Sequence, residues 1–174
     1  MYITWSRILL TPFIALCVSF PGALSAIVAA LLFIVGAITD YYDGYFARKY
    51  KVESNFGRLM DPVADKILVS VTLIMLLPLR HIDPVMVSLL LSRDLIIGAI
   101  RAAAAADNLV IAAKAFGKWK TGLQMSCIPF IIYNQPIMGV PFQWIGYVGL
   151  WFSVGLSVIS GYQYIALYLE ARKT

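Results

Sequence analysis

Long uncharged stretches, interrupted by short turn-forming segments, dominate the hydrophobic pattern of the chain. No charged residue lies between Arg7 and Asp40, and none lies in residues 121–169. Pro21-Gly22 divides the first stretch, and residues 134–141, which contain two prolines and a glycine, divide the second. Because a membrane-spanning helix needs about 20 mostly apolar residues, each stretch is long enough for two such helices.

The whole pattern predicts six helices, at about residues 2–20, 23–40, 57–79 and 84–105, with two more inside 121–169. Hydrophobic residues make up 61% of the 174 residues and charged residues only 13%. Soluble domains are typically about 45–50% apolar, and one this small could not bury so much apolar surface. We therefore predict an all-α integral membrane protein, with six transmembrane helices in a single domain, residues 1–174, rather than a soluble helical bundle.

Basic residues gather in the connections that would lie on one side of the membrane. They are Arg48, Lys49, Lys51 and Arg58 before the third helix, Lys114, Lys118 and Lys120 before the fifth, and Arg172 and Lys173 after the sixth. The opposite connections contain Arg80 as their one basic residue of the Lys/Arg type. The positive-inside rule then puts both termini and the 40–65 region on the cytoplasmic side. The net charge of +5 thus fits membrane topology and an anionic substrate, with no nucleic-acid partner.

Four aspartates lie at the junction of the second and third predicted helices. Asp40 and Asp43 are three residues apart, so they share one helix face, and Asp61 and Asp65, four apart, share another. Two antiparallel helices joined by a short loop would bring these faces together. Acidic side chains beside hydrophobic spans are costly and are usually functional, so we expect a functional carboxylate cluster.

Such a cluster predicts a divalent metal site. Converging carboxylates repel one another unless cations lie between them. Mg²⁺ prefers oxygen ligands and commonly adds substrate phosphates to a few carboxylates. Two ions could clamp a diphosphate and stabilise the attacking and leaving oxygens of a displacement. No His or Cys lies near the aspartates in the sequence, which argues against zinc. We expect two Mg²⁺ ions, with Mn²⁺ as the alternative.

The stretch Asp40-Tyr-Tyr-Asp43-Gly44-Tyr-Phe-Ala47-Arg48, followed after eight residues by Gly57, Asp61 and Asp65, resembles the signature of CDP-alcohol phosphotransferases. Eight matching positions across 26 residues form a much more specific pattern than a single glycine motif. The six predicted spans also fit this family. The resemblance implies an enzyme that displaces CMP from a CDP-activated lipid or alcohol by means of an acceptor hydroxyl.

The same resemblance implies roles for individual residues. Asp40, Asp43 and Asp61 would hold the metal ions, while Asp65 would complete the site and act as general base on the acceptor hydroxyl. The residues expected at the CDP moiety are Gly44, Arg48 and Ser54, with Thr39, Ala47, Gly57 and Arg58 lining the same neighbourhood. For the small residues, tight helix packing in lipid is an equally good explanation.

A second polar group is basic. Arg93 and Asp94 lie near the middle of the fourth predicted helix, Arg101 lies toward its cytoplasmic end, and Lys118 and Lys120 open the fifth. Two guanidinium groups in one span need an aqueous, anionic partner. The spacing puts Arg93 and Arg101 about 80° apart around the helix, so both can face one cavity. An Arg93–Asp94 ion pair, snorkelling of Arg101 and membrane-edge anchoring by the two lysines are the alternatives.

Together with Ser92 and the segment Gly117-Lys118-Trp119-Lys120-Thr121, this basic group resembles the bacterial phosphatidylglycerophosphate synthase branch of the family. The resemblance implies transfer of the phosphatidyl group from CDP-diacylglycerol to glycerol 3-phosphate. Arg93, Arg101, Lys118 and Lys120 would bind the acceptor phosphate. It also implies a homodimer in the bacterial inner (plasma) membrane, with the active site facing the cytoplasm. Inositol phosphate or serine as acceptor, or a non-catalytic cation transporter or channel, are the alternatives.

Overall fold

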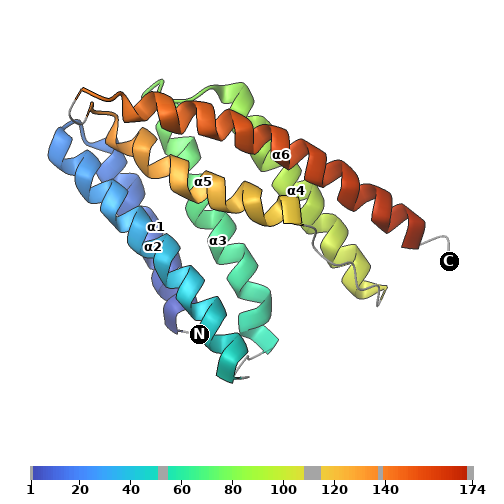
Figure 1. Ribbon diagram of the computed structural model, residues 1–174. Helices are drawn as coiled ribbons and strands as arrows, with labels where there is room; N and C mark the ends of the chain where they lie inside the picture. Colours follow the sequence, from blue (N-terminus) through green and yellow to red (C-terminus); the bar gives the residue numbers. More distant parts are fainter. Residues whose placement is uncertain (1, 51–54, 108–114, 137–138, 172–174) are drawn as a thin grey trace.

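Six helices and no strand form the described part of the computed structural model, which comprises residues 2–50, 55–107, 115–136 and 139–171 (Figure 1). Side chains are described for residues 7–39, 66–104, 107, 117, 119–136 and 139–171. The helices are α1 (Tyr2–Ser19), α2 (Ala23–Tyr50), α3 (Asn55–Leu76), α4 (Pro84–Ala106), α5 (Ala115–Tyr133) and α6 (Phe142–Ala171). They occupy the segments that the hydrophobic pattern predicts, although α2 continues about ten residues beyond its expected end.

The helices pack into a bundle around one apolar core. α1 packs on α2 and α3, α2 on α5, and α4 on α6, while α5 and α6 form the most extensive helix pair (Figure 1). Among the described residues, the contact between α3 and α4 is much less extensive. Each helix contributes a fully buried apolar side chain to the core: Ile14, Phe33, Leu68, Leu90, Ile128 and Leu150.

α5 and α6 pack closely at glycines of α6. A β-carbon at Gly146 would lie 2.8 Å from the carbonyl oxygen of Cys127 on α5. A β-carbon at Gly149 would meet the Cys127 thiol. Small residues that let two helix backbones approach closely are typical of helix pairs in lipid. The apolar α6 can therefore lie directly against α5.

The turns opposite the aspartate end fall where the sequence predicts. Gly22 separates α1 from α2 and has φ +146°, a backbone conformation that side chains with a β-carbon rarely adopt. Asn134 ends α5 with φ 44°, and its amide nitrogen lies 2.6 Å from Nε2 of His81 in the α3–α4 connection. The Tyr147 hydroxyl of α6 donates to the carboxylate of Asp83 just before α4. These side chains tie the α3–α4 turn to α5 and α6.

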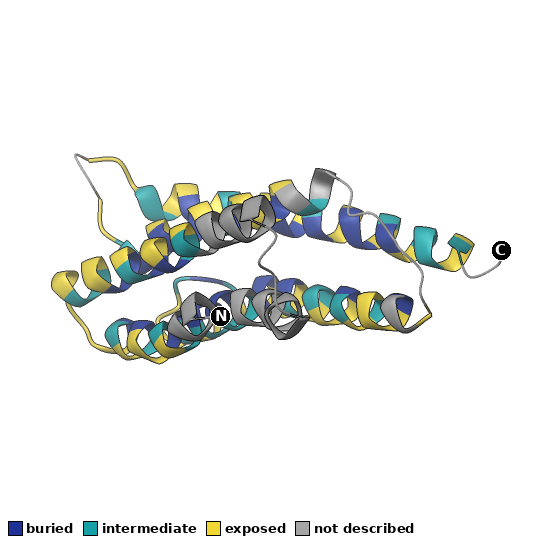
Figure 2. Cartoon of the chain, turned by 90° about the horizontal axis from the view of Figure 1, so that it is seen from below, coloured by how far each residue is buried: buried dark blue, intermediate teal, exposed yellow. Residues whose placement is uncertain are grey.

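Many of the exposed residues on the helices are large and apolar. Figure 2 shows how the exposed positions are distributed along the helices. Leu24, Leu95 and Phe152 are 76%, 72% and 68% exposed. Soluble monomers rarely expose apolar surface on this scale, so the surface indicates a membrane protein. Among the described residues, α6 is the one helix long and apolar enough by itself to cross a membrane. Shorter apolar stretches occur at Arg7–Ser19, Ala23–Thr39 and Lys66–Leu76.

Candidate active site

The four aspartates lie on the two helices that meet at one end of the bundle. Asp40 and Asp43 belong to the final part of α2, and Asp61 and Asp65 to the first part of α3. Because both members of each pair lie within one helix, their spacing of three or four residues assigns each pair to one helix face. Four residues, 51–54, separate the two helices. The side chains of these aspartates lie outside the described residues, and their convergence stays a prediction.

Most of the predicted CDP-binding positions also fall in this part of the chain. Gly44, Ala47 and Arg48 belong to α2, and Gly57 and Arg58 belong to α3, but their side chains lie outside the described residues, as does the whole of Ser54. Thr39 is described. Its hydroxyl lies 2.9 Å from the carbonyl oxygens of Val35 and Gly36 and donates to its own helix.

Asp94 on α4 is the meeting point of basic side chains from three helices. Its carboxylate oxygen Oδ1 accepts a hydrogen bond from Arg93 Nη1 at 3.0 Å and another from Lys120 Nζ on α5. Its backbone carbonyl accepts one from Lys66 Nζ on α3, also at 3.0 Å. The cluster of Lys66, Arg93, Asp94 and Lys120, which we call the Asp94 cluster, therefore carries more positive than negative charge.

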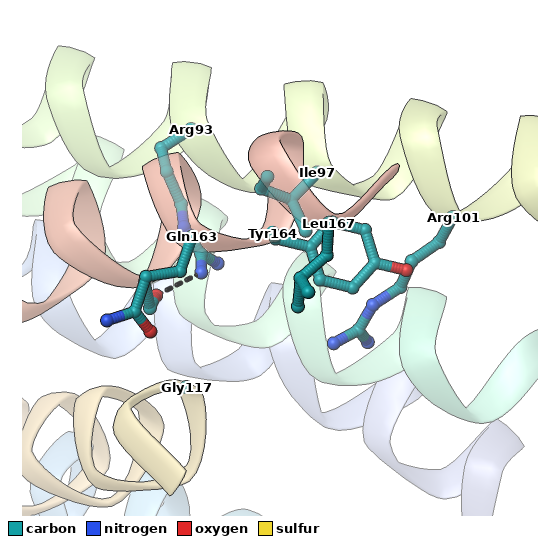
Figure 3. A pocket seen from close by; sticks show the side chains of 8 residues that line it. Arg93, Ile97, Arg101, Gly117, Gln163, Tyr164 and Leu167 are labelled. Atoms are coloured by element: carbon teal, nitrogen blue, oxygen red, sulfur yellow. Dashed lines mark hydrogen bonds between the residues drawn. The ribbon is translucent and has the colours of Figure 1, made fainter. Parts of the chain in front are cut away.

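Arg93 joins this cluster to α6. Its Nε donates to the carbonyl oxygen of Ser157 at 3.1 Å, and its Nη2 donates to the Ser160 hydroxyl (Figure 3). The ion pair with Asp94 that the sequence left open is thus present, and it accounts for only one of the three groups that the guanidinium contacts. A charged planar group held on three sides has a fixed orientation.

Arg101 lies on the same side of α4 as Arg93, as the eight-residue spacing predicts. Its guanidinium carbon lies 5.4 Å from the centre of the Tyr164 ring on α6, within the range of a cation–π interaction (Figure 3). Arg101 is exposed, whereas Tyr164 is buried. The position of Arg101 fits two roles, binding a ligand at the edge of the bundle and snorkelling of its guanidinium to the membrane interface.

A small cavity lies between α4, α5 and α6. The residues that line it are Arg93, Ile97, Arg101, Gly117, Ser160, Gln163, Tyr164 and Leu167. Its volume is about 20 Å³, enough for about one water molecule. Among the described residues, the buried amide oxygen of Gln163 has no hydrogen-bond partner. The cavity therefore combines two cationic donors with a free acceptor, a set that can bind an anion bearing hydroxyl groups.

Lys118 and Lys120, the two α5 lysines predicted to bind the acceptor, lie in the first part of that helix. Lys120 is 2% exposed and its ammonium pairs with Asp94, so it does not serve as a membrane-edge anchor. It does not line the cavity between α4, α5 and α6. Lys118 lies in the first turns of α5, and its side chain is outside the described residues.

Sequence reasoning missed several polar residues that the fold brings to the Asp94 cluster and its cavity. Lys66 directly follows Asp65 and is the last charged residue before the apolar part of the third helix, and that position was a usable signal. Ser153, Ser157, Ser160 and Tyr164 recur at helical spacing along α6 and are all buried. That spacing could have identified a polar stripe on the sixth helix, which has no charged residue before Glu170.

Comparison with known proteins identifies the class. A sequence model described as CDP-alcohol phosphatidyltransferase matches residues 1–159, so the chain belongs to the CDP-alcohol phosphatidyltransferase family. A Rickettsia felis protein named CDP-diacylglycerol–glycerol-3-phosphate 3-phosphatidyltransferase is 34% identical over 164 residues, which are 94% of this chain and 91% of that protein. A Bacillus subtilis protein of the same name is 38% identical over 146 residues, 83% of this chain and 75% of that protein.

Proposed function

We propose that this chain transfers the phosphatidyl group of CDP-diacylglycerol to glycerol 3-phosphate, giving phosphatidylglycerol phosphate and CMP in phospholipid biosynthesis. The observation that carries the proposal is a complete eight-position signature in a chain that aligns along 94% of its length with a protein named for this reaction. In the reaction, the acceptor hydroxyl attacks the phosphorus of the phosphatidyl group, its proton passes to a base, and CMP leaves.

Asp65 is the proposed base, and Asp40, Asp43, Asp61 and Asp65 are the proposed ligands of two divalent ions. The donor set fits Mg²⁺ or Mn²⁺ because it consists of carboxylate oxygens. The helix ends that carry it are separated by four residues, 51–54. When bound, such ions would supply the positive charge that a diphosphate and its departing CMP require. The CDP moiety would lie against the same helices, at Thr39, Gly44, Ala47, Arg48, Ser54, Gly57 and Arg58.

The acceptor would bind beside α4, from Arg93 near its middle to Arg101 near its C-terminus. Arg93 and Arg101 offer planar donors suited to a phosphate, with Lys118 and Lys120 on α5 adding charge nearby. The excess of positive charge in the Asp94 cluster favours a phosphorylated acceptor over free serine. The cavity measures only about 20 Å³, less than glycerol 3-phosphate occupies, so side chains that line it, such as the exposed Arg101, would have to move to admit the acceptor.

We also propose that all six helices cross a bacterial inner membrane and that the aspartate end faces the cytoplasm. The apolar outer faces and the concentration of basic residues in alternate connections support this arrangement. The charged residues that make α3 and α4 less apolar than α6 belong to the proposed site. A homodimer is expected from the family resemblance.

The acceptor assignment is tested by product analysis. Purified protein in detergent is given CDP-diacylglycerol and, in separate reactions, glycerol 3-phosphate, serine and inositol phosphate. We expect CMP release together with phosphatidylglycerol phosphate only in the first reaction. Release with another acceptor would keep the family chemistry and change the acceptor. Cation flux into liposomes without CMP release under any condition would instead favour a transporter or channel.

A further inference from the structure

One hydrogen bond joins the helix of the proposed base to the basic cluster. Lys66 follows Asp65 directly on α3, and its ammonium donates to the backbone carbonyl of Asp94 on α4 at 3.0 Å. Among the described residues, α3 and α4 contact one another over a short stretch, and this hydrogen bond is one of the interactions that join them there. The amino acid that accepts this bond is the same one whose carboxylate pairs with Arg93 and Lys120.

Gly98 makes this contact sterically accessible. In an α-helix the residue four positions later lies above a given carbonyl, and Gly98 is four positions after Asp94. A β-carbon at residue 98 would lie 2.9 Å from Lys66 Nζ, too close for an undisturbed contact. Because Nζ is the free end of a flexible side chain, Gly98→Ala would displace the ammonium rather than the helices.

We propose that Lys66 is a positioning residue. Its hydrogen bond to the Asp94 carbonyl, made in the space left by Gly98, holds the first part of α3, and with it Asp65, against the acceptor site. We call this contact the clamp. This inference rests on the proposed function. The base must reach the acceptor hydroxyl within hydrogen-bond distance, and misplacement by about 1 Å can cost about 10²-fold in rate. Lys66 itself contacts a protein carbonyl, so its loss changes the turnover step more than the binding of either substrate.

Three variants test the clamp: Lys66→Met, Gly98→Ala and the double substitution. We expect each single variant to lower kcat by about 10- to 100-fold. KM for glycerol 3-phosphate and the affinity for CDP-diacylglycerol should stay within a few-fold of the parent values. The double variant should be no slower than Lys66→Met, because Gly98→Ala acts only by moving Lys66. Gly155→Ala is the matched control, since a β-carbon there meets open space, and it should keep the parent kcat.

The outcomes separate the clamp from simpler roles. A parent-like kcat in Gly98→Ala, or losses that multiply in the double variant, would overturn the clamp. A rise in the acceptor KM with kcat unchanged would also overturn it, because Lys66 would then bind the acceptor phosphate itself. If Lys66→Met does not fold, Gly98→Ala alone decides. A parent enzyme inactive with every acceptor would refute the proposed function and the clamp together, whereas an active parent with parent-like variants would refute the clamp alone.

Discussion

Asp94 uses two different groups to hold its neighbours, its carboxylate for Arg93 and Lys120 and its backbone carbonyl for Lys66. An unpaired carboxylate inside an apolar helix would be expensive, and here it is compensated by two cations. Arg93 in turn contacts Asp94, Ser157 and Ser160 at once. Two of the side chains proposed for acceptor binding, Arg93 and Lys120, are therefore oriented by protein groups before any substrate is present.

Substitution of Arg93 tests the acceptor site at this scale. Arg93→Ala should raise KM for glycerol 3-phosphate by roughly 10- to 150-fold, the equivalent of losing one charge-assisted hydrogen bond of about 1.5–3 kcal/mol. Arg93→Lys should be poorly tolerated too, because an ammonium cannot reproduce the planar contacts with Ser157 and Ser160. Steady-state kinetics with CDP-diacylglycerol held saturating give the KM. An acceptor KM equal to that of the parent would remove Arg93 from the acceptor site, provided that the affinity for CDP-diacylglycerol is unaltered.

Asp65→Asn tests the proposed base. General-base catalysis contributes typically about 10²–10⁴-fold to a rate, so kcat should fall by at least about 10²-fold. Binding of CDP-diacylglycerol, followed with a labelled lipid, should survive better than in Asp61→Asn. Equal loss of lipid binding in both variants would mean that Asp65 acts chiefly as a metal ligand.

At the scale of helices, the α5–α6 pair depends on a close backbone approach. Gly146→Ala should lower the free energy of unfolding in detergent by about 1–3 kcal/mol, because a β-carbon 2.8 Å from the Cys127 carbonyl forces the two backbones apart. Thermal unfolding of the purified protein measures the effect. Gly155→Ala on the same helix, where there is open space, should leave the unfolding midpoint unchanged. Matching midpoints for the two variants would show that α5 and α6 do not need this approach.

The connection between α3 and α4 should make stability depend on pH. Burial lowers the pKa of His81 below its ordinary value of 6.5. Between pH 6.5 and the lower folded-state value, the unfolded chain binds more protons, so the free energy of unfolding falls as the pH falls. The unfolding midpoint should decrease on acidification from pH 7, and less so in His81→Gln. An identical pH dependence in parent and variant would exclude His81 as the cause.

The helices and the aspartate motif could be predicted from the sequence, because both follow from local spacing. The helix boundaries depend on uncharged stretches and on turn residues such as Gly22, which separates α1 from α2 and has φ +146°. The continuation of α2 to Tyr50 was not foreseen, because the uncharged stretch that predicts the helix stops at Asp40. The apolar pattern predicts that a helix forms. It does not predict how far the polar segment that follows continues that helix.

The contacts around Asp94 could be predicted only in part. The Arg93–Asp94 pair was foreseeable from adjacent charges, and the shared side of Arg93 and Arg101 from their spacing. The bond from Lys66 to a backbone carbonyl depends on how α3 lies on α4 and on the missing side chain of Gly98. Such contacts arise when segments distant in the sequence pack together, so the spacing of residues within one helix cannot predict them.

The whole molecule, of 174 residues, combines an apolar outer surface with charged side chains between its helices. The outer faces are apolar, as in Leu95 and Phe152, and suit contact with lipid. The charged side chains of Arg93, Asp94 and Lys120 lie between helices and are at least partly buried. This division is the one expected of an enzyme whose lipid substrate stays in the membrane while its polar groups react among protein side chains.

Divalent-dependent CMP release tests the central claim most directly. The parent protein in detergent, with CDP-diacylglycerol and glycerol 3-phosphate, should release CMP in the presence of Mg²⁺ and stop when EDTA is added. Asp40→Asn, Asp43→Asn and Asp61→Asn should each abolish turnover and weaken the divalent-dependent binding of CDP-diacylglycerol, because each removes a carboxylate ligand. Undiminished CMP release in EDTA, or near-parent activity in any of the three variants at ordinary Mg²⁺, would contradict the aspartate metal site.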